Sequence, residues 1–340
     1  MKALVVTSSR QFGEAEHPTP VLRDGYALVK VAYGAICGSD RISWENPAPN
    51  CPGHEFSGIV EDPGTTGFKK GDRVCAPEIN PCGECEFCKA GKHNLCPSMT
   101  TYSVGMDIDG AYSEYVPVRG ERLRKLPNDY PLELGALAEP LAVSLHGVHR
   151  LGFEPGNKLL IWGNGPIGIF AALYAKKHGA SEIYMVGRGQ GRVDFCNRLG
   201  YVDACFSVND PEFDAKLAAV SPENGFEYVI DALGSPDAFD QILTKTKPDG
   251  KVALLGLHSF SVNFSALLLL GKEINLIPSW FFTLEEYDEA VKFIGENREE
   301  VERLITSRIP HNKDAVQQMF EKLFVSGKND ECKVIIDYSL

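Results

Sequence analysis

The sequence predicts a two-domain α/β protein in which a mostly β domain is combined with a doubly wound parallel sheet. Three observations lead to this prediction. The chain has 340 residues, which exceeds the size of a usual single core. Before about residue 145, short apolar segments alternate with Gly and Pro turns, which is typical of an irregular, mostly antiparallel β domain. After it, buried strands alternate with helical stretches, which is typical of a parallel sheet.

The first domain is expected to cover residues 1–145 and 282–340. Its opening residues, 1–6, are mostly apolar and predict a strand rather than a targeting segment. The apolar stretch 27–33 predicts another strand. Beyond residue 281 the chain is expected to return to this domain with two helices and a last strand, at 285–296, 313–324 and 333–337.

The second domain is expected over residues 146–281, where strand and helix patterns alternate. Buried strands are predicted at 158–162, 182–186, 228–231 and 251–255. Helices are predicted at 166–178 and 192–199. Because this alternation places successive strands side by side in one parallel sheet, the domain is predicted to be doubly wound.

Four cysteines lie within fifteen residues of one another in C-x2-C-x2-C-x7-C spacing, namely Cys82, Cys85, Cys88 and Cys96. Four thiolates this close, in a loop punctuated by Gly and Pro, can close a tetrahedral zinc site. Such a structural site leaves no coordination position for substrate. Two disulfides or four unrelated buried thiols are the alternatives, but the density of the cluster and the lack of a secretory signal favour zinc.

A different set of ligands must then do any metal chemistry. Cys37 follows the predicted strand at 27–33, His54 and Glu55 lie in a Pro-Gly-His-Glu-Phe segment, and Glu139 lies in an Ala-Glu-Pro segment. A thiolate, an imidazole and a carboxylate form a mixed set that suits zinc and can stay open to substrate. Each piece alone is weak evidence, because a lone His beside Glu is more often a structural pair.

A glycine-rich turn connects the predicted strand 158–162 to the predicted helix 166–178. It comprises Gly163, Asn164, Gly165, Pro166, Ile167 and Gly168. The glycines permit a tight turn and close approach of the backbone to a pyrophosphate at the positive end of a helix. The bare pattern is common, but its position between strand and helix favours dinucleotide binding over a merely structural turn.

The end of the next strand indicates which dinucleotide is bound. NAD-binding folds usually place an acidic residue there to hold the ribose hydroxyls. This chain has Gly187, Arg188 and Arg192, and no acid before Asp194. The arginines can clamp a 2′-phosphate, which favours NADP. In the alternative, Arg192 stacks on adenine and Arg188 is a solvated surface charge, which is compatible with NAD.

The chain resembles the zinc-containing medium-chain dehydrogenases over essentially its whole length. The resemblance rests on motifs in the family's order, namely Cys37-Gly38-Ser39-Asp40, Gly53-His54-Glu55 with Gly58, Gly71-Asp72-Arg73-Val74, the four-cysteine lobe and the glycine-rich turn. Segment 138–143 resembles the polyol (sorbitol-like) and polyol-phosphate branch rather than the simple alcohol dehydrogenases.

The resemblance implies a GroES-like catalytic domain interrupted by a Rossmann-type cofactor domain. It implies zinc held by Cys37, His54 and a carboxylate from Glu55 or Glu139, with hydride passing between a carbinol carbon and the nicotinamide. Ser39 matches the family's proton-relay hydroxyl, although a turn serine is the alternative. Asp40 is expected to hold a ligand or nearby backbone.

Three positions bear on how far the resemblance extends. Family members often carry a His where this chain has Ile42, so proton release would need water, the cofactor ribose or another group. Arg41 is close enough in sequence to the ligand cysteine to face the cleft and bind a substrate phosphate. His258 is a candidate neighbour of the nicotinamide if its strand ends there.

Composition limits the classes of partner. The net charge of −12 disfavours nucleic acid and anionic membranes. No apolar run approaches the ~18 residues that a membrane span needs. Cysteine usage fits a reducing cytoplasm. We expect a cytoplasmic homodimer or homotetramer that acts on a small molecule.

The leading hypothesis is a zinc-dependent, NADP-preferring dehydrogenase for a secondary alcohol of a polyol, sugar acid or polyol phosphate. The alternatives are a dehydrogenase for small alcohols and ketones, and a non-catalytic nucleotide-binding relative. The retention of Cys37, His54, Glu55 and Glu139 argues against a non-catalytic relative.

Overall fold

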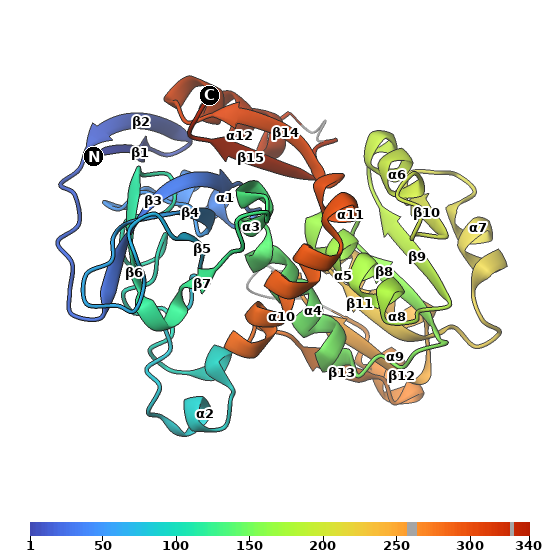
Figure 1. Cartoon of the computed structure of the whole chain (residues 1–340). Coiled ribbons are helices and arrows are strands. Elements are labelled where there is room, and N and C mark those ends of the chain that lie inside the picture. Colours follow the sequence, from blue (N-terminus) through green and yellow to red (C-terminus); the bar gives the residue numbers. More distant parts are fainter. Residues whose placement is uncertain (257–263, 327–329) are drawn as a thin grey trace. The chain divides into compact units, whose positions relative to one another are not determined.

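A computed structural model describes residues 1–256, 264–326 and 330–340 of the chain (Figure 1). They form two compact units, one comprising Met1–Pro140 with Phe282–Leu340 and the other Leu141–Phe281. The second unit therefore interrupts the first in the sequence. The boundary expected near residue 145 and the observed division at residue 140 both lie within helix α4 (Ala138–Leu151).

The first unit is built on a seven-stranded sheet in the order β14-β15-β3-β4-β5-β7, with β6 paired to β3. Adjacent strands of this sheet run antiparallel, except for β14 and β15, which are parallel. The strands are β3 (Tyr26–Ala35), β4 (Glu55–Asp62), β5 (Arg73–Cys75), β6 (Tyr115–Arg119), β7 (Arg124–Lys125), β14 (Ile305–Pro310) and β15 (Lys333–Asp337). A separate hairpin joins β1 (Lys2–Ser8) and β2 (Gln11–Glu16). The predicted mostly antiparallel β fold is confirmed.

Helices of the first unit are short in its N-terminal part and longer in its C-terminal part. They are α1 (Asp40–Glu45), α2 (Glu86–Lys89), α3 (Leu132–Gly135), α10 (Leu284–Glu296), α11 (Arg298–Glu302) and α12 (Lys313–Phe324), with single turns at η1 (His93–Leu95) and η2 (Gly120–Arg122). A capping box at Thr283 and Glu286 starts α10. Aromatic packing of Trp44 and Phe12 on Phe320 ties α1 and β2 to α12. The helices predicted at 285–296 and 313–324 agree with α10 and α12.

The second unit contains a six-stranded sheet in the order β10-β9-β8-β11-β12-β13, in which every pairing is parallel. The strands are β8 (Lys158–Trp162), β9 (Glu182–Gly187), β10 (Ala204–Ser207), β11 (Phe226–Asp231), β12 (Thr246–Leu254) and β13 (Asn275–Pro278). The chain runs outward from β8 to β10, then returns beyond β8 to β11. This reversal of strand order is the position at which doubly wound sheets bind ligands, and the predicted Rossmann-type sheet is confirmed.

The helices of the second unit are α5 (Pro166–Lys177), α6 (Gln190–Asn197), α7 (Phe213–Val220), α8 (Phe239–Lys245) and α9 (Ala266–Lys272), with a single turn at η3 (Pro236–Ala238). Leu159, Leu160 and Ile161 of β8 are all fully buried, as expected for a central parallel strand covered on both faces. Helix α6 begins at Gln190, two residues before its predicted start. Sequence patterns did not predict β10, β13, α7, α8 or α9.

Within residues 1–256, 264–326 and 330–340, every helix is too short or too polar to span a bilayer.

Candidate active site and zinc centre

Cys37 lies in the turn between β3 and α1 and is fixed there by its neighbours. Its backbone N–H donates to Asp40 Oδ2 over 2.9 Å, and Ser39 Oγ donates to its sulfur over 3.2 Å. The first bond holds the backbone of the turn, and the second holds the sulfur in one orientation. The predicted supporting role of Asp40 agrees with this contact to the cysteine backbone.

Glu55 is the first residue of β4, opposite Ala35 at the end of β3, and His54 directly precedes it. Gly53 makes this entry possible because its φ is +99° and an added Cβ would lie 2.5 Å from the ring of Tyr112. Any larger residue would push the strand away from that ring. The glycine of the Pro-Gly-His-Glu segment therefore sets the position of both polar side chains.

The structure brings Cys37, His54 and Glu55 into one group whose ligand atoms all lie within 4.8 Å of one another. A thiolate, an imidazole and a carboxylate are donors that zinc accepts readily. Glu55 Oε1 is buried without a hydrogen-bond partner among the described residues, so an acceptor atom is left for a cation. The donor set fits zinc. Glu139, the other predicted carboxylate ligand, lies outside this group.

A buried lysine balances part of the negative charge. Lys333 is 1% exposed, and its ammonium group donates to Glu55 Oε2 and, over 2.9 Å, to the carbonyl oxygen of Ile36. Because both charged groups are removed from water, the pair must be held together by direct contact. Lys333 thereby fixes one oxygen of Glu55, while the other makes no hydrogen bond among the described residues.

Asp40 connects several parts of the site. Besides bonding the Cys37 backbone, it accepts a 2.8 Å hydrogen bond from the Tyr112 hydroxyl and lies 3.5 Å from His54 Nδ1. Burial by itself lowers the pKa of His54, but the Cys37 thiolate and the Asp40 carboxylate raise that pKa well above its usual value. The Asp40 carboxylate beside Nδ1 also orients the imidazole, as acids beside metal-binding histidines usually do.

Two further buried acids lie in the same surroundings. Glu139, in the first turn of α4, is 6% exposed, and Glu78 is 2% exposed. Burial raises the pKa of Glu139 well above its usual value, and the Glu78 carboxylate raises it further. Burial raises the pKa of Glu78 as well. An excess of buried acid over buried base favours a cation at this place.

A cavity of about 210 Å³ lies beside these residues in the first unit. Ser39, His54, Ile42 and Met106 are among the residues that line it. Ser39 is half-buried here, so its hydroxyl reaches both Cys37 and the cavity. Ile42 is 59% exposed and carries no titratable group.

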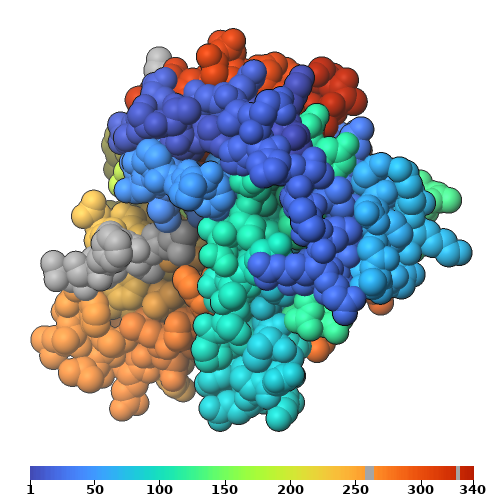
Figure 2. Space-filling model, turned by 90° about the vertical axis from the view of Figure 1, so that its left-hand side faces the viewer, coloured from blue at the N-terminus to red at the C-terminus, as the bar shows by residue number. Residues whose placement is uncertain are grey.

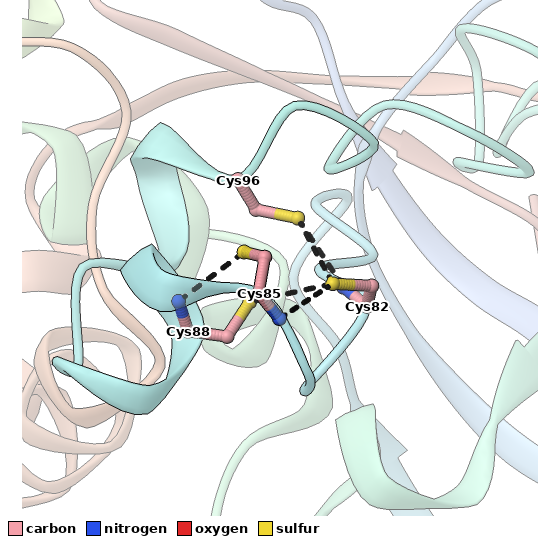
Figure 3. Close-up of side chains that lie close together, drawn as sticks. All are labelled: Cys82, Cys85, Cys88 and Cys96. Carbon is pink, nitrogen blue, oxygen red and sulfur yellow. Dashed lines mark hydrogen bonds between the residues drawn. The ribbon is translucent and has the colours of Figure 1, made fainter.

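The four cysteines of the lobe form a second group whose sulfur atoms lie within 4.8 Å of one another. Figure 3 shows the four side chains pointing toward one another. The sulfur of Cys82 lies 3.6 Å from that of Cys96 and 3.9 Å from that of Cys88. A tetrahedron with Zn–S bonds of about 2.3 Å has edges of about 3.8 Å. A disulfide needs about 2.05 Å, and all four are free cysteines. The lobe fits a zinc site.

Backbone geometry prepares these sulfurs for a metal. The N–H groups of Cys85 and Cys88 donate to the sulfurs of Cys82 and Cys85, each over 3.4 Å. Burial opposes ionisation of Cys96, but hydrogen bonds from Ser98 and the Cys82 backbone lower its pKa to about 6. In Figure 2 the lobe is the cyan surface at the bottom of the view.

The glycine-rich turn has the geometry that a dinucleotide needs. Gly163 follows β8 with a φ of +123°, and Gly165 precedes α5, whose first residues are Pro166 and Ile167. A Cβ on Gly168 would lie 2.1 Å from the carbonyl oxygen of Gly163, so the helix packs directly against the turn. In the part of the chain that the structure describes, no side chain caps the N-terminus of α5, which leaves its first N–H groups available to a pyrophosphate.

Gly187, the last residue of β9, lies against Asn164 of the turn. A Cβ at position 187 would lie 2.0 Å from the side-chain carbon Cγ of Asn164. Asn164 is buried and donates to the Arg188 carbonyl over 3.4 Å. Arg188 is exposed, whereas Arg192 of α6 is half-buried with its guanidinium 3.9 Å from the position of a Cβ on Gly165. The backbone of Arg188 and the guanidinium of Arg192 therefore lie beside the turn, at the strand end that lacks an acid.

Comparison with known proteins identifies the family of this chain. Residues 23–128 match the family described as alcohol dehydrogenase GroES-like domain, and residues 166–296 match zinc-binding dehydrogenase. D-xylulose reductase A from Aspergillus niger is 31% identical over 312 residues, which cover 86% of this chain and 85% of that protein. The chain belongs to the zinc-containing medium-chain dehydrogenases. It is an NAD(P)-dependent alcohol dehydrogenase.

Other relatives of this dehydrogenase cover nearly its whole length. Sorbitol dehydrogenase from Bacillus subtilis (strain 168) is 27% identical, with 99% of this chain and 97% of that protein covered. A dehydrogenase structure from Sinorhizobium meliloti 1021, solved bound to NADP, is 26% identical with a TM-score of 0.85 and covers 99% of this chain and 98% of its own. The family and its polyol branch, expected from the motifs, are confirmed.

Several residues of the dehydrogenase site were not found from sequence. Lys333 lies in an apolar strand, where a lone lysine is itself a signal that a buried partner exists. No sequence pattern of that kind points to Tyr112 or Glu78. Arg41 is exposed, and its Nε lies 3.1 Å from Glu45 Oε1. Its guanidinium is not among the groups that line the cavity. His258 lies outside the described residues.

Proposed function

We propose that this dehydrogenase transfers hydride between a secondary alcohol of a polyol, sugar acid or polyol phosphate and NADP(H), giving the ketone. The observation that carries the proposal is the convergence of Cys37, His54 and Glu55 within 4.8 Å, next to a cavity. Three protein ligands and an open side are the arrangement of a catalytic rather than a structural zinc site.

In this proposal Cys37 and His54 hold the metal, and Glu55 completes the shell with its free oxygen. Glu139 is a carboxylate that exchanges with Glu55 or with water. Bound zinc supplies a Lewis acid that lowers the pKa of the substrate alcohol, and the nicotinamide accepts the hydride. Lys333 and Asp40 keep Glu55 and His54 in position, which limits the reorganisation needed during the reaction.

Ser39 is proposed to accept the alcohol proton. Its hydroxyl borders the cavity and lies 3.2 Å from the Cys37 sulfur, which is within reach of a substrate oxygen bound nearby. Because position 42 is an exposed isoleucine, the proton must leave Ser39 through water or the cofactor ribose.

NADP is proposed as the preferred cofactor. Asn164 occupies the space in which an acidic side chain at position 187 would lie, so no carboxylate repels a 2′-phosphate. Arg188 and Arg192 provide donors for that phosphate. The NADP bound to the Sinorhizobium meliloti relative is consistent with this preference.

The names of two relatives support a polyhydroxylated substrate. D-xylulose reductase and sorbitol dehydrogenase both refer to sugars or sugar alcohols. A site built to pair several hydroxyl groups rejects analogues that lack them, because its own polar groups would be left unpaired. Short alcohols are therefore expected to be poor substrates.

The proposal extends to assembly and location. The four-cysteine lobe is proposed to hold a structural zinc, which requires reduced thiols and so suits the cytoplasm. A homodimer or homotetramer is proposed because β13 is an edge strand of its sheet and Leu267 and Leu270 of α9 are 80% and 71% exposed. Light scattering coupled to size-exclusion chromatography tests the assembly.

A substrate panel tests the proposed function. The zinc-loaded enzyme is assayed with xylitol, sorbitol, an aldonate, a polyol phosphate and butan-2-ol, with NADP and with NAD. The proposal expects at least one polyhydroxylated substrate to exceed butan-2-ol in kcat/KM by about tenfold or more, a factor worth about 1.4 kcal/mol. Higher kcat/KM for butan-2-ol would mean that the enzyme is a small-alcohol dehydrogenase. No turnover with any substrate would indicate a non-catalytic relative.

A further inference from the structure

Arg122 is a buried cation attached to the base of the four-cysteine lobe. It lies in the single turn η2, between β6 and β7, and is only 4% exposed. One nitrogen of its guanidinium donates to the carbonyl oxygen of Pro81 over 2.5 Å. Pro81 directly precedes Cys82, the first cysteine of the lobe. Arg122 therefore holds the backbone from which the lobe begins.

The protein provides no acid to neutralise this guanidinium. Within the described ranges Arg122 forms no ion pair, and its Nε is buried without a hydrogen-bond partner. Moving a cation out of water without a compensating anion is unfavourable, because the lost hydration is not replaced. A buried arginine of this kind is explained best if another group supplies the missing negative charge.

The charges around Arg122 indicate where that negative charge can come from. Burial lowers the pKa of Arg122 to about 10, and the nearby Arg119 lowers it further. Glu121 and the lobe cysteine Cys88 raise this pKa. Glu121 already pairs with Arg119, since its Oε2 lies 3.2 Å from a guanidinium nitrogen. The lobe therefore remains as the nearby source of negative charge.

The lobe carries this charge when it holds a metal. Four thiolates bring more negative charge than one Zn²⁺ neutralises, so an occupied lobe is a net anion. Cys88 and Cys96 are 8% and 3% exposed, so water screens only part of that charge. An empty lobe with protonated thiols is neutral. The interaction between Arg122 and the lobe is thus favourable mainly in the occupied state.

We propose that Arg122 is the counter-ion of the zinc–thiolate centre in the lobe. It is a positioning residue, which stabilises the occupied lobe by its charge and fixes the backbone before Cys82 by its bond to Pro81. The inference rests on the structural zinc proposed for the lobe and goes beyond it, because the zinc affinity of the lobe then depends on a residue outside it. Arg122 should stabilise the zinc-loaded protein and destabilise the zinc-free protein.

The test compares variants that remove or keep the charge at position 122. Arg122→Met removes it, and Arg122→Lys keeps it. Arg119→Met is the matched control, because Arg119 is an arginine of the same segment with a side chain that is 34% exposed and paired with Glu121. All variants are made in the full chain carrying His54→Ala, where the lobe is the intact metal-binding group of the described residues.

Two quantities are measured for each protein. The Kd for zinc is obtained by competition with a chromophoric chelator. The Tm is recorded with zinc bound and again after zinc has been removed with EDTA. If Arg122→Met yields no folded protein, Arg122→Gln replaces it with the same expectations, because glutamine keeps a donor for the Pro81 carbonyl but carries no charge.

We expect Arg122→Met to raise the Kd for zinc about ten- to a hundredfold, the usual effect of losing a group that supports metal ligands. The Tm of its zinc-loaded form should fall, whereas the Tm of its zinc-free form should stay the same or rise, because an unpaired buried charge has been removed. The Kd of Arg122→Lys should lie closer to that of the parent protein than to that of Arg122→Met. Arg119→Met should match the parent in every measurement.

Three results would overturn the inference while leaving the lobe zinc in place. An unchanged Kd in Arg122→Met would mean that Arg122 does not support the centre. An equal loss of Tm with and without zinc would mean that Arg122 acts through packing alone. A Kd as weak in Arg122→Lys as in Arg122→Met would mean that its charge is not what matters. Failure of the proposed lobe zinc looks different, because the parent protein would then bind no zinc.

Discussion

Asn164 fills the space into which any side chain at position 187 would project, with only 2.0 Å between its Cγ and the place of a Cβ there. The second residue of the glycine-rich turn and the last residue of β9 are therefore sterically coupled. The end of β9 thus lacks an acid, and Asn164 occupies the space that an acidic side chain there would fill. We therefore expect cofactor choice in this chain to depend on two positions rather than one.

This coupling predicts the outcome of a double-mutant cycle. Gly187→Asp alone should lower Tm and weaken both cofactors, because overpacking at a buried contact costs about 1–3 kcal/mol. Gly187→Asp combined with Asn164→Gly should recover most of the Tm, and should bind NADH more tightly than NADPH. Cofactor fluorescence titration gives the Kd values. Additive losses in the double variant would show that the two positions are independent.

Arg188→Ala should weaken NADPH binding far more than NADH binding. A charge-assisted hydrogen bond to the 2′-phosphate is worth about 1.5–3 kcal/mol, or roughly ten- to a hundredfold in Kd. Arg198→Ala, which removes an exposed arginine just after α6, serves as the matched control. Equal losses for NADPH and NADH in Arg188→Ala would point to adenine stacking or general disruption, and a native preference for NADH would refute the assignment.

Lys333→Met should destabilise the protein strongly, because it leaves Glu55 buried without a counter-ion. Breaking such a pair costs about 3–5 kcal/mol, whereas an exposed pair is worth about 1 kcal/mol or less. Lys70→Met, which breaks the exposed Lys70–Glu61 pair, is the control. Urea unfolding measures the loss. The double variant Lys333→Met/Glu55→Gln should regain much of it, and no recovery would mean that Lys333 acts through packing alone.

Cys85→Ser should loosen the four-cysteine lobe and lower stability without touching the cleft residues. Losing one of four ligands weakens the lobe metal, and a cost of about 2 kcal/mol lowers Tm by roughly 4–8 °C in a unit of this size. Calorimetry and protease cleavage of the lobe check this. Cys332→Ser, at a buried cysteine outside both groups, is the comparison. An unchanged Tm in Cys85→Ser would show that the lobe needs no metal.

Much of this fold could be predicted from local patterns. The strand at 158–162, the helix at 313–324 and the strand at 333–337 agree with β8, α12 and β15 because their apolar periodicity is unbroken. β10 and β13 were missed because each has only four residues. The cysteine lobe and the glycine-rich turn could be found because their residues are close in sequence.

The unpredicted part of the site depends on long-range contacts. Lys333 meets Glu55 across 278 positions, and Tyr112 meets Asp40 across 72. No spacing rule connects residues that far apart. Glu78 was missed for a related reason, because its neighbours His54, Glu55 and Glu139 come from other segments of the sequence.

The most direct test of the account is the zinc content of wild type and His54→Ala, measured by elemental analysis on protein prepared without chelator. The account predicts close to two zinc ions per chain in wild type and one in His54→Ala, with polyol oxidation abolished and the fold retained by circular dichroism. Wild type with a single zinc that His54→Ala still binds would contradict it, because the cleft would then hold no metal.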